Sequence, residues 1–221
     1  MVEKFDPGTQ ANLFPLPEVF REFSSFCPEM KEEIPAVELP EVREKAPCME
    51  VQAAMIREEF LNIKELQFEN WITLLPGERM VALQELEDRV AEISHREPLL
   101  VLVTELPGRV AGCCNGEDLM LSEEYVMDNS YTSYRSMLDT FFHEGRHGYQ
   151  FYNLNGNRVE ANEALVESWE NNLVLDKYHS VRMDVKEWGF RRYQEQPIEV
   201  DARIFAEQVM TELELGPRYR K

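Results

Sequence analysis

The residues most able to do chemistry lie together in the segment His143-Glu144-Gly145-Arg146-His147. Two positions four apart lie one turn above each other on the same face of a helix. Both imidazole rings can therefore reach one metal ion, with Glu144 beside any water bound to it. Because the chain has only four histidines, this spacing is a specific signal. The alternative interpretation is that His143 and His147 are ordinary surface or core histidines one turn apart.

A third metal ligand is expected elsewhere in the chain, because a catalytic zinc site normally takes three protein ligands and keeps a fourth position open. The best candidate is Glu199, which follows Pro197 at the expected start of a helix. Two further acids could orient the ligands by hydrogen bonds: Asp201, two residues after Glu199, and Asp139, four residues before His143. For both acids the alternative is a capping or surface charge.

A site of two imidazoles and one carboxylate predicts hydrolysis. Zinc is the expected cofactor, since these ligands in a tetrahedral arrangement suit it. It lowers the pKa of its water towards about 7, and Glu144 is the expected general base that takes the proton as the water attacks a carbonyl carbon. A second group is needed to stabilise the oxyanion, and Tyr193 is the candidate, with His179 as the second choice. For both side chains the alternative is a purely structural role.

The elements that must position these residues begin with an arm and a helical hairpin. Residues 1–48 hold seven of the twelve prolines, which predicts an extended arm whose apolar residues pack onto the body. In residues 49–97 the apolar positions recur at spacings of three and four, which predicts two amphipathic helices. We expect one helix over about 49–66 and another over about 78–94, joined by the turn at 74–77.

Residues 98–221 are expected to hold the site, on an α+β core that forms one structural unit with 49–97. The apolar run at 99–103 predicts a buried strand. Two further short strands flank Asn115-Gly116, a pair that favours a type I′ turn, which predicts a β-hairpin over 109–122. The remaining segments have residue patterns typical of helices, which we expect over about 132–152, 161–177 and 197–213.

At these two motifs the chain resembles a known group of enzymes. HEGRH followed by a downstream glutamate is similar to the gluzincin branch of the zincin metallopeptidases, in which two helices bring both motifs to one zinc ion. The similarity is greatest to the minimal ImmA/IrrE-like members, whose second motif reads E-x-x-A-x-x-F-A. The matching residues here are Glu199, Ala202, Phe205 and Ala206. The resemblance covers about residues 99–210 and is strong only at the motifs.

This resemblance implies His143, His147 and Glu199 as zinc ligands, Glu144 as general base, and a mostly helical zincin-like domain with a small mixed sheet. It also implies that the hairpin before the HExxH helix supplies an edge strand that pairs with an extended peptide. The substrate-binding residues on that strand would be Gly112, Cys113 and Cys114. The stretch between the two motifs is longer than in the most compact members, so the helix over 161–177 must be an insertion.

Composition narrows the possible partners and compartments. The chain has 23 Lys and Arg against 42 Asp and Glu, a formal net charge of −19, which disfavours binding to nucleic acid or to anionic membranes. No signal peptide or membrane-spanning run is visible. Four cysteines without CxxC spacing predict reduced thiols and a cytoplasmic protein. Export by a route without a cleavable signal stays open, and the sequence does not indicate the oligomeric state.

The sequence thus predicts a zinc-dependent metallopeptidase that hydrolyses a peptide bond in an extended protein or peptide substrate. Two alternatives remain open at this point. One is a bacterial effector or toxin-type amide hydrolase that acts on a cell-wall or modified side-chain amide. The other is a binding or regulatory module that keeps the zincin fold without turnover. Retained metal and lost hydrolysis on removal of the Glu144 charge would separate the enzyme from the module.

Overall fold

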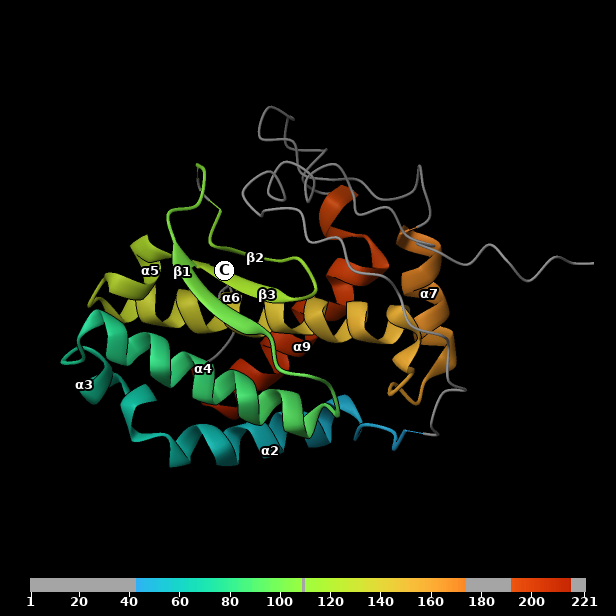
Figure 1. Cartoon of the computed structure of the whole chain (residues 1–221), viewed down its shortest axis with the longest axis horizontal. Coiled ribbons are helices and arrows are strands. Elements are labelled where there is room, and N and C mark those ends of the chain that lie inside the picture. The colour runs from blue at the N-terminus through green and yellow to red at the C-terminus, as the bar shows by residue number, and fades with distance from the viewer. Residues whose placement is uncertain (1–42, 109, 174–191, 216–221) are drawn as a thin grey trace, which may run out of the picture.

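The computed structural model describes residues 43–108, 110–173 and 192–215. It is mostly helical with one small mixed sheet, which confirms the expected α+β class. The elements, in chain order, are α2 (Met49–Asn62), η1 (Lys64–Leu66), α3 (Phe68–Trp71), α4 (Pro76–Ile93), β1 (Leu100–Thr104), β2 (Gly112–Cys114), β3 (Asp118–Ser122), α5 (Glu123–Met127), α6 (Tyr131–Tyr152), η2 (Asn153–Asn157), α7 (Glu163–Leu173) and α9 (Pro197–Glu212). Figure 1 shows the sheet on one side of the long helix α6 and α9 on the other.

Helix α2 is shorter than its apolar pattern predicted. It ends at Asn62, and Ile63 takes an extended conformation, so the prediction of a helix to residue 66 is wrong. The chain turns there because Leu66 and Trp71 lie in the core with no exposed surface. The side chain of Gln67 stabilises the turn by donating to the carbonyl of Phe60 at 3.1 Å. The predicted simple turn at 74–77 is therefore replaced by η1 and α3, and α4 begins at Pro76.

The three strands form a sheet in the order β1-β3-β2. Strand β1 pairs parallel with β3, and β2 pairs antiparallel with β3, which confirms the predicted hairpin. The predicted type I′ turn is wrong, because only Gly116 of the pair has a positive φ, of 95°. The side chain of Asn115 explains the difference, since its Oδ1 accepts from the backbone N–H groups of Glu117 at 2.9 Å and Asp118 at 2.7 Å. An Asx-type turn therefore closes the hairpin.

The two edges of this sheet differ in what they offer to another strand. Gln84 of α4 occupies the outer edge of β1: its Nε2 donates to the carbonyl of Leu99 at 3.0 Å, and its Oε1 accepts from the N–H of Val101 at 2.9 Å. The amide thus imitates a neighbouring strand at this point. Strand β2, at the opposite edge, faces α6 and the expected site. This arrangement favours β2 as the edge for an added strand.

The larger hydrophobic cluster of the described residues extends from Ala53 of α2 to Met210 of α9, and a smaller one includes Tyr149, Trp169 and Ile198. Residues 49–97 contribute to the larger cluster together with described residues from 98 onward. Of the expected arm, residues 1–42 lie outside the described part of the chain. Its last residues pack on the body, where Ala46 is buried and donates to the carbonyl of Val159 at 2.9 Å.

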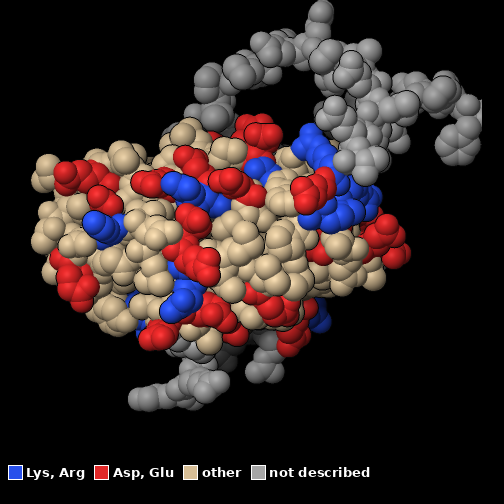
Figure 2. All heavy atoms as spheres, turned by 90° about the horizontal axis from the view of Figure 1, so that it is seen from below, with Lys and Arg blue, Asp and Glu red and all other residues tan. Residues whose placement is uncertain are grey.

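Charged groups are spread over the surface. Figure 2 shows acidic side chains distributed across the face seen from below, interspersed with Lys and Arg that gather mainly at one end. The net charge of −19 therefore does not form one acidic patch on this face. Within the described residues, none of the helices has the length and apolar character that crossing a bilayer requires.

A buried ion pair fixes α4 to the start of the sheet. Arg96 donates from both terminal nitrogens to Glu87, whose side chain has no exposed surface, and the N–H of Leu99 donates to the same carboxylate at 2.8 Å. Arg96 Nη1 also donates to the carbonyl of Glu97 at 3.0 Å, so among the described residues the partners of these two side chains are each other and backbone groups. Removing one of them leaves the other buried without a counter-charge.

We predict that Glu87→Ala lowers the free energy of unfolding by about 3–5 kcal/mol, because Arg96 then stays buried without a counter-charge. Urea unfolding followed by circular dichroism measures this value. The matched control is Glu85→Ala on the same helix, whose carboxylate is half exposed and lies 3.8 Å from Arg89. That exposed pair contributes below about 1 kcal/mol. Equal effects of the two changes would contradict the prediction.

Candidate metal centre

Helix α6 carries the HEGRH segment and begins where its sequence contains a capping residue. The side chain of Ser130 accepts from the N–H of Ser133 at 3.1 Å, and Asp128 in turn accepts from the N–H of Ser130 at 3.1 Å. The helix then runs uninterrupted to Tyr152. His143 and His147 face α9, and Glu144 lies beside β2. The predicted helix and the placement of both histidines on one face are thus confirmed.

Helix α9 carries Glu199 in its first turn, and α7 fixes that turn. Asn172 of α7 accepts from the N–H of Ile198 at 3.2 Å and donates to the side chain of Gln196 at 3.1 Å. Pro197 occupies the first helical position, where no N–H is needed. The helix expected over 161–177 is observed as α7, Glu163–Leu173, and residues 174–177 lie outside the described part of the chain. Asn172 of this helix caps the start of α9, which carries the third candidate ligand.

The ligand atoms of His143, His147 and Glu199 form a compact triangle. The two Nε2 atoms lie 3.2 Å apart, and Glu199 Oε2 lies 3.4 Å from His143 Nε2 and 3.6 Å from His147 Nε2. With metal–ligand distances near 2.0–2.1 Å, the edges of a tetrahedral zinc site measure about 3.3–3.4 Å. The triangle therefore has the size of one face of such a site, and among the described residues it is the group able to hold a metal.

The polar atoms of this triangle also fit a cation. Glu199 Oε2 is buried and has no hydrogen-bond partner among the described residues, although a buried carboxylate oxygen is normally satisfied. Its neighbours are two imidazole nitrogens at distances too long for good hydrogen bonds. A divalent ion between the three atoms would satisfy all of them. The residues present therefore fit zinc, and His143, with 22% of its side chain exposed, leaves the site open on one side.

The charges in the cluster shift two of its pKa values in opposite directions. Burial works to raise the pKa of Glu199, but the two histidines outweigh it and hold this pKa well below its usual range. Burial likewise disfavours the charged form of His147, yet the carboxylates of Glu199 and Glu144 raise its pKa to about 9. The site thus attracts positive charge, which a proton or a metal ion can supply.

Glu144 has the surroundings of a general base. Burial raises its pKa, opposed by the charges of His143 and His147 and reinforced by Glu199. Its side chain lies against β2, since Glu144 Cγ is 3.2 Å from the position of a Cβ added to Gly112. A carboxylate with a raised pKa close to the candidate ligands suits a group that takes up and releases a proton.

Strand β2 lies against the HEGRH helix because residue 112 is a glycine. A Cβ added to Gly112 would lie 2.6 Å from Thr140 Cγ2, 2.9 Å from the carbonyl oxygen of Met120 and 3.2 Å from Glu144 Cγ. Only a residue without a side chain allows this approach. The predicted substrate-binding strand, Gly112 to Cys114, is thus brought next to the predicted general base.

The two cysteines of β2 are thiols that do not act as metal ligands in this arrangement. Burial, with the charge of Glu144, raises the pKa of Cys113 to about 12, and burial raises the pKa of Cys114 further. Both are therefore protonated at neutral pH. What this strand offers a substrate is its backbone.

Asp201 is buried near the site, but it does not contact a ligand histidine directly. It accepts from Arg146 Nε at 2.8 Å and from Gln150 Nε2 at 2.7 Å. Gln150 makes the contact instead, with its Oε1 2.8 Å from His147 Nδ1. Sequence reasoning left both Gln150 and Arg146 open between the cleft and solvent, and assigned neither a role. One sequence signal could have indicated a role for Gln150. It is a polar residue three positions after His147, on the helix face that the apolar pattern predicts to be buried.

The roles expected of three other candidate site residues stay predictions. Asp139 is partly buried on α6, one turn before His143. Tyr193 is partly buried just before α9, and its carbonyl accepts from the backbone and side chain of Gln196, each at 3.2 Å. His179 lies outside the described residues.

Comparison of the chain with protein-family models, with curated proteins and with solved structures found no match. The interpretation of the site therefore depends on its own geometry and on the motifs in the sequence.

We predict that the purified chain binds one zinc ion and that His143→Ala abolishes this binding, because two remaining ligands do not complete a site. Metal content by mass spectrometry measures the stoichiometry. Chelation should lower the melting temperature of the wild-type chain, since a ligand at 100 times its Kd contributes about 2.7 kcal/mol. The control is His95→Asn, which removes an imidazole elsewhere and tolerates the positive φ of 53°. Unchanged zinc content in His143→Ala would refute the site.

We predict that Gly112→Ala destabilises the protein by about 1–3 kcal/mol, because the added methyl group overlaps Thr140 and the backbone at Met120. Thermal unfolding measures the effect. Gly77→Ala is the matched control: a Cβ there meets nothing within 4 Å, and alanine favours the helix by about 1 kcal/mol. Gly112→Ala should therefore lower the free energy of unfolding, and Gly77→Ala should raise it.

Proposed function

We propose that this protein is a zinc-dependent metallopeptidase of the gluzincin type that cleaves extended polypeptide segments. The observation that carries the proposal is the triangle of two imidazole nitrogens and one orphaned carboxylate oxygen, 3.2–3.6 Å on each side. The HExxH helix, the downstream glutamate and an adjacent edge strand support the same assignment.

His143, His147 and Glu199 would hold the ion. Zinc, when bound, supplies a Lewis acid that polarises the scissile carbonyl and makes water acidic. Glu144 takes the proton from the attacking water at its carboxylate and passes it to the nitrogen of the leaving amine. Tyr193 remains our candidate for the donor that stabilises the oxyanion.

The substrate would lie along the outer edge of β2. Asn115 donates to Asp118 at 3.2 Å and Ser122 donates to Ala111 at 2.9 Å, so the backbone groups that face β3 alternate along the strand. This alternation directs the N–H and the carbonyl of Gly112 away from β3. A peptide added there gains main-chain hydrogen bonds next to Glu144, which favours an extended chain over a compact substrate.

Glu144 favours turnover over a purely binding or regulatory role. Three ligands and an ion suffice to hold a structural or binding site, and a further carboxylate raises the cost of burial. A carboxylate with a raised pKa beside the candidate ligands is in the position that a proton-transferring base needs, which supports turnover. The free thiols of the described cysteines, Cys48, Cys113 and Cys114, support action in the reducing cytoplasm.

We predict that Glu144→Gln retains zinc and lowers the rate of peptide hydrolysis by about 100-fold to 10,000-fold, because the amide cannot accept the proton. Cleavage of a proteome-derived peptide library, read by mass spectrometry, measures the loss. Glu123→Gln, an exposed acid on α5, is the control and should leave the rate unchanged. A zinc-loaded wild-type chain that cleaves no peptide would overturn the proposed function.

A further inference from the structure

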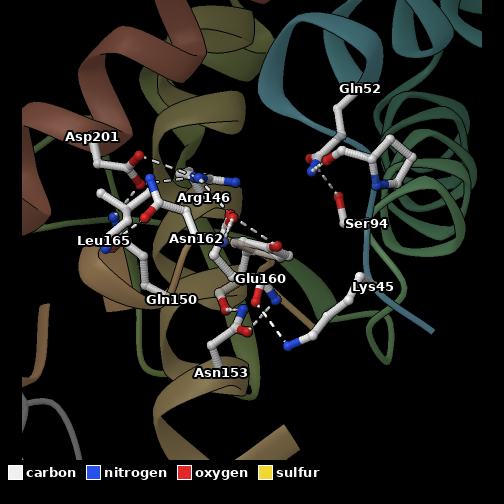
Figure 3. A network of polar contacts seen from close by, with 12 residues as sticks. Lys45, Gln52, Ser94, Arg146, Gln150, Asn153, Glu160, Asn162, Leu165 and Asp201 are labelled. Carbon is white, nitrogen blue, oxygen red and sulfur yellow. Dashed lines mark hydrogen bonds and ion pairs between the residues drawn. The ribbon is translucent and has the colours of Figure 1, made fainter. Parts of the chain in front are cut away.

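A chain of hydrogen bonds leads from the candidate site into the protein interior. Gln150 Oε1 lies 2.8 Å from His147 Nδ1, and Gln150 Nε2 donates to Asp201 Oδ2 at 2.7 Å and to the carbonyl of Ile198 at 2.9 Å. Figure 3 shows Gln150 directed at Asp201, with Arg146 on the other side of that carboxylate. The Gln150 side chain has no exposed surface, so no water replaces these partners.

These partners determine which way round the Gln150 amide lies. The carboxylate of Asp201 and the carbonyl of Ile198 accept hydrogen bonds and cannot donate them, so the NH₂ group must face both. The amide oxygen must then face His147, and the atom opposite it must be a donor. Nδ1 of His147 therefore carries a proton, and the lone pair of a neutral ring lies on Nε2, which is the atom in the ligand triangle.

We propose that Gln150, held by Asp201, is a positioning residue that fixes the tautomer and the direction of His147 for metal binding. The inference rests on the proposed function only in taking zinc as the ion. A ligand histidine is commonly oriented by a carboxylate in direct contact. Here a neutral amide makes that contact, and the carboxylate lies one residue farther away, paired with Arg146 at 2.8 Å.

This arrangement keeps excess negative charge away from the ligand. A carboxylate directly on His147 would add a third acid at the site, beside Glu144 and Glu199. The Arg146 guanidinium instead pairs with Asp201 through Nε and Nη2, at 2.8 and 3.2 Å. Gln150 lies between this ion pair and the imidazole, so it orients the ring as a neutral side chain held by Asp201.

The test compares two substitutions of Gln150 in two measurements. Gln150→Met has nearly the same shape and cannot accept from His147, so zinc affinity, measured by competition with a chromogenic chelator, should fall about 10-fold to 100-fold. Gln150→Glu keeps an acceptor for His147 and should bind zinc close to wild type. In urea unfolding of the zinc-free protein, Gln150→Glu should be the less stable of the two variants. The reason is that it places a second carboxylate against Asp201.

Gln52→Met is the matched control. Gln52 is also a buried glutamine with a bonded amide, which donates to the carbonyl of Pro47 at 2.7 Å, and it lies apart from the Arg146 network (Figure 3). Gln52→Met should lower stability and leave zinc affinity unchanged. If Gln150→Glu does not fold, a lower zinc affinity of Gln150→Met than of Gln52→Met still supports the proposal.

The outcomes separate this inference from the proposed function. Equal zinc affinity of Gln150→Met and wild type, or zinc affinities that simply follow folding stability, would overturn the positioning role and leave the peptidase proposal intact. Zinc binding that depends on Gln150 in a chain that cleaves no peptide would overturn the peptidase proposal alone. A wild-type chain that binds no zinc would overturn both.

Discussion

The site depends on the contact between α6 and α9, and the ion pair of Arg146 and Asp201 lies at its centre. The guanidinium contacts Asp201 at 2.8 Å and lies over the ring of Tyr149 at 4.3 Å, with about 1% of its side chain exposed. A buried charge costs several kcal/mol unless it is matched, so this pair strongly disfavours other arrangements of the two helices. Arg146 precedes His147, and Asp201 follows Glu199 by two residues. The same ion pair therefore sets the distance between the third ligand and the histidines.

Acidic side chains close to one another explain the electrostatic character of the site. Glu144, Glu199 and Asp201 lie near the HEGRH segment of α6, and Arg146 pairs with Asp201 among these three. The remaining negative charge raises the pKa of His147 to about 9, so in the absence of a metal ion the ring holds a proton. A divalent cation would replace that proton and satisfy the orphaned oxygen of Glu199. The cluster thus has lower free energy with a positive charge at its centre, and the proposed zinc ion would supply that charge.

The small sheet restricts where an extended chain could bind. The amide of Gln84 occupies the outer edge of β1, whereas Gly112 allows the edge strand β2 to lie directly against α6. The main-chain groups of β2 are therefore beside Glu144, the proposed general base. The inserted helix α7 has a comparable role at the other motif, because Asn172 caps the turn that holds Glu199. Residues outside the two motifs, such as Gly112 and Asn172, thus help to position the side chains of the motifs.

The sequence by itself determined the α+β class, the HExxH helix, the hairpin and the identity of the three candidate ligands, because periodicity and residue spacing are local properties of the chain. It predicted α2 too long and the turn at Asn115-Gly116 wrongly, because the buried positions of Leu66 and Trp71 and a side-chain turn overrode the local pattern. Only the tertiary structure decided that Gln150 donates to Asp201 and that Arg146 pairs with the same carboxylate. Those two contacts join residues 51 and 55 positions apart in the chain. Their geometry follows from how α6 and α9 pack, which spacing along one helix does not specify.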